Sequence, residues 1–291
     1  MKKFMTYCLC AVTMALCLSC GSDDPEMSPN DPGKVQAGSK LPNGLVCTQW
    51  GGSNIQYNID GTIKNQTLRN YGVAHYSYNP LVVTVKNEYG IMEKYYDFTF
   101  NSAGLITSFK CDWYEDGVKE ETGVHNFQYV NGCLSQYEFI EEYYYGDGDY
   151  WLYSRNVQLV WSNGSVVQIN RVTEEVDGEW GGVGSGTYYF TSGGTQNRFN
   201  QPTLDVMCCA LDMCPFEPYN SLCALAMNGK FGKFSKYFPV IVRDEGEYKG
   251  NTYIDMWQYE YEFNSNGLVS EFCEDYDRFV AVSCSYANLA K

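Results

Sequence analysis

One phrase of the sequence occurs twice. Residues 96–109 read YDFTFNSAGLITSF, and residues 259–272 read YEYEFNSNGLVSEF, 163 positions later. In each copy an aromatic-rich run leads to an Asn-Ser-x-Gly segment, after which a second apolar run begins. Asn and Gly tolerate the positive φ angles that tight turns require. We therefore predict that each copy is one strand, one tight turn and the start of the next strand, at two positions around a large sheet.

Turn signals of two kinds divide the chain. One kind contains Asn and Gly with little charge: Asn101 to Gly104, Asn131-Gly132, Asn163-Gly164 and Asn264 to Gly267. The other kind is acidic: Glu115-Asp116-Gly117, Gly146-Asp147-Gly148-Asp149, Asp177-Gly178 and Asp244-Glu245-Gly246. The two kinds alternate between residues 101 and 178, which indicates an up-and-down meander, because each strand carries the chain to the opposite end of the sheet. The acidic turns should then gather at one rim, opposite the Asn-Gly turns.

Side chains alternate along the repeated phrase, which predicts one aromatic face and one polar face. In the second copy the aromatic set is Trp257, Tyr259, Tyr261 and Phe263, and the polar set is Gln258, Glu260 and Glu262. In the first copy the aromatic set is Tyr96, Phe98 and Phe100, opposite Asp97 and Thr99.

The segments between turn signals number about twelve to fifteen, more strands than a twisted open sheet usually carries without curling. We therefore predict an all-β fold, an antiparallel up-and-down meander closed or nearly closed into a large barrel. The aromatic face should point inward, because the 26 Tyr, 15 Phe and 6 Trp residues reach further into a wide barrel than aliphatic residues do. An outer-membrane porin would instead turn its apolar face to lipid, and residues 287–291 lack the terminal aromatic residue typical of such barrels.

Residues 202–230 break this pattern. They read PTLDVMCCALDMCPFEPYNSLCALAMNGK, in which Leu, Met, Ala and Cys replace the alternating aromatic residues. Pro202 can open a helix, Pro215 and Pro218 can end it, and Asn228-Gly229 can close a second short helix. We predict a short helical insert that covers the mouth of the barrel or plugs its interior.

The N-terminus is typical of a secretory signal peptide, with Lys2 and Lys3 before an apolar stretch from Phe4 to Leu18. The following Leu18-Ser19-Cys20-Gly21 resembles the lipobox of bacterial lipoproteins. The resemblance implies cleavage before Cys20 and acylation of that cysteine with fatty acid such as palmitate. The alternative is an uncleaved membrane anchor, although the apolar run is shorter than the ~20 residues that a spanning helix needs.

Residues 21–26, GSDDPE, resemble the acidic export signal of Bacteroidota-type lipoproteins. The resemblance implies an outer-membrane lipoprotein exposed on the cell surface, with the periplasmic face as the alternative. The chain then divides into a signal peptide (1–19), a flexible Pro- and Gly-containing tether from Cys20 (20–44) and a single barrel-like domain (45–291).

Three features together resemble a family of Bacteroidota surface lipoproteins of unknown function with a porin-like β fold. They are the F-x-F/Y-N-x-x-G-L-x-x-x-F phrase, the helical interruption and residues 231–236, FGKFSK. The strand-turn-strand phrase is also similar to the YD-type repeats of secreted proteins. Neither resemblance supplies catalytic residues.

Charge limits the class of partner. Without Lys2 and Lys3 the chain has 18 Lys and Arg against 35 Asp and Glu, a net charge of −17. Such a surface repels phosphate backbones, so nucleic acid is not expected as a partner. The expected partners are the outer membrane, through the lipid on Cys20, and a glycan or another envelope protein.

Residues suited to catalysis or metal binding occur without a recognisable arrangement. His75 and His125 lie outside any nucleophile context, so we expect structural or surface histidines. Neighbouring acids such as Glu141-Glu142 and Glu174-Glu175 point to opposite faces of a strand and cannot flank one bond. Nine of the 13 cysteines remain after Cys8, Cys10, Cys17 and Cys20 are set aside, and we expect most of them to be buried, with one disulfide in the insert left open. We expect no resident metal and no cofactor; calcium at Asp147-Gly148-Asp149 is the alternative, although these residues lack the ligand series of an EF-hand loop.

Three classes of function remain: a non-catalytic surface binding module, a structural envelope component without a soluble ligand, and an enzyme acting on polysaccharide. We rank them in this order, because binding needs only a concave site with exposed rings and polar groups. The Tyr143-Tyr144-Tyr145 run, followed by Tyr150 and Trp151, puts rings on both faces of its hairpin. The predicted ligand-binding residues are Tyr144, Trp151, Asp147 and Asp149.

Overall fold

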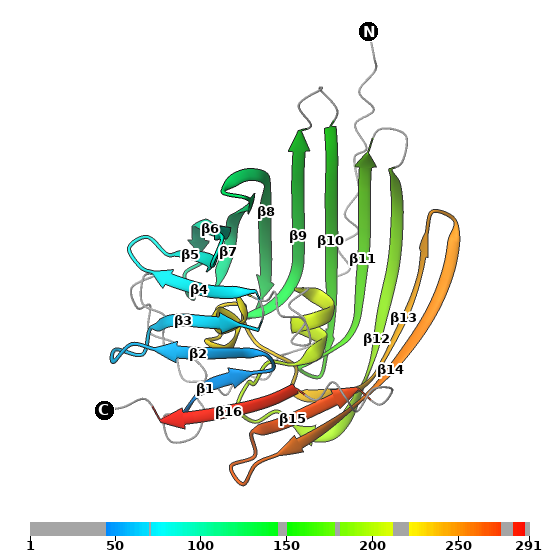
Figure 1. The fold of residues 1–291 in the computed structure, drawn as a ribbon. Coiled ribbons are helices and arrows are strands. Elements are labelled where there is room, and N and C mark those ends of the chain that lie inside the picture. Colours follow the sequence, from blue (N-terminus) through cyan, green and yellow to red (C-terminus); the bar gives the residue numbers. More distant parts are fainter. Residues whose placement is uncertain are drawn as a thin grey trace.

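The sheet closes on itself. The computed structural model describes residues 45–69, 71–144, 150–177, 181–211, 221–274 and 282–288. In these residues sixteen antiparallel strands follow one another around a closed barrel, in which β1 pairs with β16 (Figure 1). The predicted all-β meander and its closure are confirmed, with one strand more than the upper end of the expected range. Cys20 and the tether lie outside the described residues, so the signal peptide and its lipid remain predictions.

The strands differ greatly in length. The shorter strands of the first half are β1 (Leu45–Trp50), β2 (Ser53–Tyr57), β3 (Ile63–Leu68), β4 (Gly72–Ser77) and β5 (Val82–Asn87). The longer strands are β6 (Gly90–Phe100), β7 (Ile106–Glu115), β8 (Val118–Val130), β9 (Cys133–Tyr144), β10 (Tyr150–Ser162), β11 (Ser165–Asp177), β12 (Gly182–Gln196), β13 (Tyr237–Tyr248) and β14 (Asn251–Phe263), and the barrel ends with β15 (Val269–Glu274) and β16 (Val282–Asn288). Strands β9 to β12 rise above the rest in Figure 1. Together with the neighbouring long strands β13 and β14 they form one tall wall of the barrel, which we define as β9–β14.

The repeated phrase makes the same turn twice. Asn101 connects β6 to β7: its N–H donates to the Leu105 carbonyl (2.9 Å), and its Oδ1 accepts from Ala103 N and Leu105 N (both 3.0 Å). Asn264 repeats these bonds between β14 and β15, with Leu268 in the place of Leu105 (2.8 Å). Gly104 and Gly267 take φ angles of 74° and 77°. Both copies of the phrase therefore encode the same type of turn, in which the Asn side-chain oxygen accepts hydrogen bonds from two backbone N–H groups.

The two copies of the phrase differ in which side chains face the interior of the barrel. Trp257, Tyr259, Tyr261 and Phe263 all pack against the core, as predicted for β14. In β6 the prediction is wrong for Tyr96. Asp97 takes a φ of 55° and the register shifts there, so Phe98 and Phe100 pack inward while Tyr96 lies outside and donates to Asp112 Oδ1 (3.1 Å). One bulged residue moves the preceding side chain to the opposite face.

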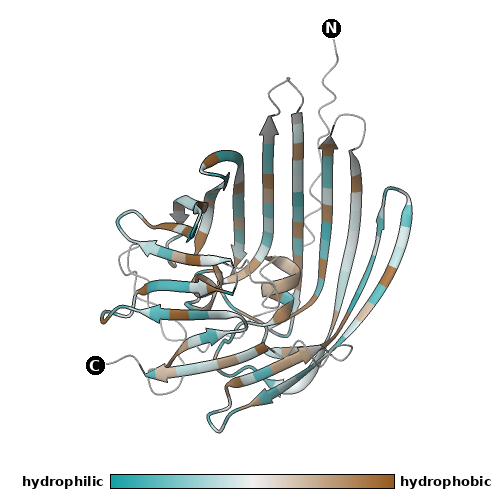
Figure 2. Cartoon of the chain, viewed as in Figure 1, coloured by the Kyte–Doolittle hydropathy of each residue, from teal (hydrophilic) through white to brown (hydrophobic). Residues whose placement is uncertain are grey.

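Aromatic rings fill much of the interior, as predicted. Phe109, Phe231, Phe238 and Phe272 are among the largest fully buried side chains. Ring contacts link neighbouring strands, for example Phe109 with Phe127 at 5.6 Å between centroids and Tyr261 with Phe272 at 5.9 Å. Figure 2 shows hydrophilic and hydrophobic residues alternating along the long strands, in keeping with one inner and one outer face.

Within the described residues, Glu115-Asp116-Gly117 lies at the opposite end of the barrel from the Asn-Gly turns, as expected, and we call this end the acidic rim. Residues 146–149 and Gly178 lie outside the described part, so their place at this rim stays a prediction. Asn131-Gly132 and Asn163-Gly164 are two-residue turns with positive φ at both positions, as in type I′ turns. Asp244-Glu245-Gly246 is not a turn: these residues lie inside β13, paired with Asp255, Ile254 and Tyr253 of β14. The chain reverses instead at Lys249-Gly250, with φ angles of 50° and 79°.

The connection between β12 and β13 contains the predicted helical insert. It forms a π-helical turn, η2 (Asp205–Ala210), and a short helix, α1 (Cys223–Met227), with residues 212–220 outside the described part. Both helical pieces lie inside the barrel in Figure 1, and α1 is wholly buried. Gly229, with a φ of 70°, follows α1 as the Asn-Gly signal predicted. No helix in the described residues is long and apolar enough to span a membrane.

Hydrogen bonds fix the insert to the wall around it. Tyr76 Oη donates to the Ser221 carbonyl (2.7 Å), and Ser221 Oγ donates to Glu93 Oε2 (2.8 Å). Residues 230–236 then follow the Asn-Gly end of the barrel: the Lys230 carbonyl accepts from Ile106 N (2.9 Å), Lys233 N donates to Gly132 O, and Lys236 N donates to Gly164 O (both 2.8 Å). Lys230, Lys233 and Lys236, three residues apart, thus form backbone hydrogen bonds with three successive hairpins on the Asn-Gly side. The insert therefore occupies the Asn-Gly end of the barrel, opposite the Glu115-Asp116-Gly117 turn.

Cysteines contribute to the core as small hydrophobic residues, as predicted for most of them. Five are buried: Cys47, Cys111, Cys133, Cys223 and Cys284. Burial raises the pKa of the Cys47 thiol to about 12, so this side chain stays protonated and apolar.

Candidate functional site: a tyrosine- and arginine-lined cavity

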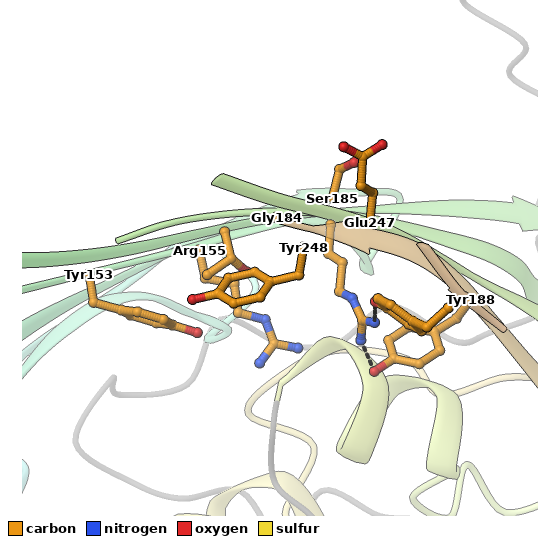
Figure 3. Close-up of a pocket in the computed structure, with 10 residues that line it drawn as sticks. Tyr153, Arg155, Gly184, Ser185, Tyr188, Glu247 and Tyr248 are labelled. Carbon is orange, nitrogen blue, oxygen red and sulfur yellow. Dashed lines mark hydrogen bonds between the residues drawn. The ribbon is translucent and has the colours of Figure 1, made fainter. Parts of the chain in front are cut away.

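The inner face of the tall wall holds a cavity of about 350 Å³. Strand register brings its lining together from five strands. One row across the sheet is Arg171, Gly186, Gly246 and Tyr253, and the next row toward the acidic rim is Arg155, Thr173, Gly184 and Tyr248. Tyr153 and Tyr188 complete the inward-facing set. Figure 3 shows Tyr153, Arg155, Tyr188 and Tyr248 on one side of the sheet, whereas the side chains of Ser185 and Glu247 project from the other side.

Three glycines make room for this arrangement. A Cβ on Gly186 would lie 2.8 Å from Arg171 Nε and 2.9 Å from Tyr253 Oη, and a Cβ on Gly184 would lie 2.8 Å from Tyr248 Cδ2. A Cβ on Gly246 would also overlap the Tyr253 ring. Glycine weakens a strand and often marks a place where other groups approach the backbone closely. Here the bare backbone of β12 and β13 receives the side chains that line the cavity.

Arg171 is held from several sides. Its Nη2 donates to Asp244 Oδ2 and to Tyr253 Oη (both 2.5 Å), and its Nη1 donates to Tyr188 Oη. The guanidinium carbon also lies 4.2 Å from the centre of the Tyr188 ring. Burial raises the pKa of Asp244, and the charge of Arg171 opposes that shift. A guanidinium fixed by a carboxylate, two hydroxyls and a ring face has little freedom to reorient.

Arg155 connects the cavity to the insert. The residue is 8% exposed, and its Nη2 donates to the carbonyl of Cys209 in η2 (3.2 Å). Arg155 lies on β10, opposite Phe139 of β9 and Thr173 of β11. The insert therefore helps to fix the position of one of the two arginines of the cavity.

Trp151, the described member of the predicted ligand-binding group, lies at the edge of this site. Its ring stacks on Tyr153 with 6.0 Å between centroids, and its Nε1 donates to Glu175 Oε1 (3.3 Å). Tyr248 Oη donates to the other oxygen of Glu175 (2.9 Å), and these bonds lower the pKa of Glu175. Asp147, Asp149 and the side chain of Tyr144 lie outside the described part of the structure, so their role stays a prediction.

The adjacent acidic residues Glu141 and Glu142 point to opposite faces of β9, as predicted, and Glu141 contacts a different carboxyl, that of Glu121. Glu142 and Glu174 are exposed, whereas Glu141 lies opposite the inward-facing residues Gly123 and Tyr153. Burial raises the pKa of Glu141 to about 8, and a hydrogen bond that the protonated Glu141 donates to the neighbouring Glu121 carboxylate adds to the shift. Two carboxyls in hydrogen-bond contact are closer than the roughly 5 Å or more that separates glycosidase acid and base.

Neither histidine forms a catalytic arrangement with the described residues. His75 is exposed on β4. His125 stacks between Phe109 and Phe139, with centroids 4.3 and 4.6 Å away, and burial lowers its pKa to about 3. Its Nδ1 lies 3.0 Å from Tyr137 Oη. His125 is thus a neutral member of the aromatic core. Within the described ranges, no three His, Cys, Asp or Glu side chains gather so as to hold a metal ion.

Sequence analysis missed the two arginines and the three glycines. Arg155 and Arg171 stand among ordinary strand residues, and only the register of β10 against β11 brings them into neighbouring rows of the sheet. The one available signal was Gly182-Val183-Gly184-Ser185-Gly186, glycines at a period of two within a strand. No protein-family model matches the chain, and no curated protein matches it significantly.

Proposed function

We propose that this protein is a non-catalytic binding module of the cell envelope that takes a glycan into the open end of its barrel. The observation that carries the proposal is the convergence of four tyrosines and two arginines on one cavity of about 350 Å³. Pockets of roughly 300–1,000 Å³ with a few convergent polar groups are typical of small-ligand sites. Tyrosine rings can stack on the C–H face of a sugar ring, while their hydroxyls and the guanidinium groups can bond its hydroxyls.

The shape of the site favours a glycan over a whole protein as the ligand. A stable protein interface buries about 800 Å² on each partner, on surfaces that are mostly open. The cavity is instead recessed on the concave side of the tall wall, and the insert occupies the Asn-Gly end. A ligand therefore enters from the acidic rim, past Trp151 and Tyr153.

A glycan array with the full chain purified in detergent tests this proposal. Tyr153→Ala and Trp151→Ala should each weaken binding about tenfold, because the loss of one stacking ring costs roughly 0.5–1.5 kcal/mol beyond the buried area. Tyr189→Ala is the matched control, since Tyr189 is exposed on the opposite face of β12. Absence of any bound glycan, or binding that survives both inner substitutions, would exclude this site and favour a structural envelope component.

The envelope location is part of the proposal and rests on the N-terminal residues. Cys20 would carry a fatty acid, and the acidic residues after it would direct the protein to the outer surface. Cys20→Ala should release the protein into the soluble fraction, and persistent membrane association would refute the lipid anchor. Protease treatment of intact cells separates the surface from the periplasmic face, because only a surface-exposed domain is cleaved.

A further inference from the structure

One long strand of the tall wall has an open edge in the described structure. β14 pairs with β13 along Asn251–Gln258, whereas β15 pairs with β14 only from Tyr259 to Phe263. No other strand in the described residues pairs with β14 on this side. In Figure 1 the upper part of β14 forms the margin of the tall wall. The sheet therefore closes through the Asn-Gly end of β14, and Asn251–Gln258 is an edge segment.

The backbone groups on this edge belong to alternate residues. Lys249-Gly250 has positive φ at both positions, so it is a two-residue turn closed by the hydrogen-bonded pair of Tyr248 and Asn251. Hydrogen-bonded and non-hydrogen-bonded pairs alternate along an antiparallel ladder. Three residues therefore direct their N–H and C=O groups away from β13 and toward the open edge: Thr252, Ile254 and Met256.

The edge is also apolar and unprotected. The side chains of Ile254 and Met256 are on the outer face of the wall, and these residues are 66% and 55% exposed. Natural edge strands are commonly protected by Lys, Pro or a bulge. Residues 251–258 read NTYIDMWQ, with Asp255 as the one charged residue, and their register against β13 is unbroken. An open edge of this kind is a template for pairing with another strand.

We infer that this edge pairs with the same edge of a second copy of the chain, so that two tall walls join into one continuous sheet. Segments with little charge, no Pro and few Gly pair readily with identical segments. In an antiparallel pairing centred on Ile254, this residue lies opposite the partner subunit's Ile254, and Thr252 lies opposite the partner subunit's Met256. Each opposed pair exchanges two backbone hydrogen bonds, and the apolar side chains cover one another on the outer face.

The charges near the edge permit this pairing, although the whole chain has a formal net charge of −15. Asp255 lies opposite the partner subunit's Tyr253, and the two Asp255 side chains are diagonal neighbours about 7–8 Å apart. Glu245 and Glu247 on β13 lie one strand further from the interface. Because charges at about 8 Å and beyond are largely screened at physiological ionic strength, the dimer should become tighter as the salt concentration rises.

Sedimentation equilibrium of the full chain in density-matched detergent measures the association from about 1 μM to about 1 mM. One strand pair is a small interface, so we expect a reversible dimer. Ile254→Pro should weaken the dimer at least about tenfold, because it removes an N–H that faces away from β13 and so takes hydrogen bonds only from the interface. Ile254→Val is the matched control: it keeps the N–H and the branched side chain and should associate like the unchanged chain.

Two cysteine variants test the register. Opposed residues of a hydrogen-bonded antiparallel pair have Cα atoms about 5.5 Å apart, within the range of disulfides. Oxidised Ile254→Cys should therefore form a disulfide-linked dimer above the background of the unchanged chain. Thr252→Cys, exposed on the same edge, should not, because the two copies of this residue are separated by four residues along the strands, on the order of 13 Å.

The outcomes decide between a paired and an unpaired edge. A chain that stays monomeric over the whole concentration range overturns the inference, whether the edge is open or is covered by residues 275–281, which lie outside the described part. Association that is unchanged in Ile254→Pro, or equal cross-linking of Ile254→Cys and Thr252→Cys, also overturns it. If Ile254→Pro does not fold, the two cysteine variants provide the test.

Discussion

Arg171 on β11 and Asp244 on β13 form an ion pair across the intervening strand β12, with 2.5 Å between Nη2 and Oδ2. The two side chains are 17% and 6% exposed, and the Arg171 side chain lies over Gly186, where a Cβ would touch its Nε. Three strands of the tall wall are thus joined by one charged contact. Because water has little access to it, each partner depends on the other.

Arg171→Met should therefore lower the free energy of unfolding by about 3 kcal/mol, because Asp244 would remain buried without its counter-charge. Urea denaturation followed by tyrosine and tryptophan fluorescence measures the change. The double variant Arg171→Met/Asp244→Leu should regain much of the loss. Arg243→Met removes an exposed pair with Glu245 and should change stability by no more than about 1 kcal/mol. A double variant less stable than both single variants would contradict the conclusion that Arg171 and Asp244 each depend on the charge of the other.

The fold could be predicted largely from local chemistry. The Asn turns, the alternating aromatic residues of β14 and the apolar insert each specify their structure within a few residues, so the sequence was sufficient for the meander and the insert. Tyr96 was misplaced, because the one difference at this point is Asp97, a residue type that takes a positive φ more readily than Glu260 at the matching place in the second copy. A single bulge reverses the faces, and bulges have weak sequence signals.

The site was much harder to predict than the fold. Trp151 was identified because its hairpin is rich in rings, but Arg155, Arg171 and Tyr253 come together only through the register of separate strands. Asp244-Glu245-Gly246 was misread as a turn, because Asp and Gly are typical turn residues. In β13 they serve the site instead: Asp244 fixes Arg171, and Gly246 leaves space for Tyr253.

Gly186→Ala should disturb the cavity, and its effect on stability should exceed that of the change in strand propensity alone. The new methyl group would overlap Arg171 Nε and Tyr253 Oη, which lie 2.8 and 2.9 Å from its position, so one of these side chains must move. We expect a loss of about 1–3 kcal/mol in the free energy of unfolding, as for other overpacked sites. Gly194→Ala in the same strand is the control, because no atom lies within 4 Å of its Cβ position. Equal stability of the two variants would show that the glycine space is not needed.

Stability should fall as the pH rises from mildly acidic to mildly basic values. Burial raises the pKa of Glu141 from 4.5 to about 8 and that of Asp205 from 3.8 to about 6. The folded state therefore holds these protons where the unfolded state releases them, so their contribution is complete below the unfolded pKa values and is lost as the pH rises through the folded ones. Melting temperatures measured between pH 4 and pH 9 should decline, most clearly above pH 6.5, because the lowered pKa of the buried His125 acts in the opposite direction below that value.

Two substitutions identify the groups responsible. Glu141→Gln should flatten the decline between about pH 5 and pH 8, because a neutral amide replaces the titrating carboxyl beside Glu121. Asp205→Asn should act at lower pH. Glu142→Gln is the control for the first variant, since Glu142 is the exposed neighbour of Glu141 on the outer face of β9. A decline that persists unchanged in Glu141→Gln would show that other groups cause it.

The repeated phrase provides a test of the turn chemistry with an internal duplicate. Asn101→Ala and Asn264→Ala each remove one side-chain oxygen that accepts two backbone N–H groups at 2.9–3.1 Å. Each should cost about 1–2 kcal/mol, the range seen when a side chain that accepts from backbone N–H groups is removed. The two losses should add in the double variant, because the turns lie on different hairpins and share no partner. Ser102→Ala, at an exposed position of the first turn, should leave the unfolding midpoint unchanged. If Asn101→Ala proves as mild as Ser102→Ala, the repeated asparagine does not stabilise the turn through its side chain.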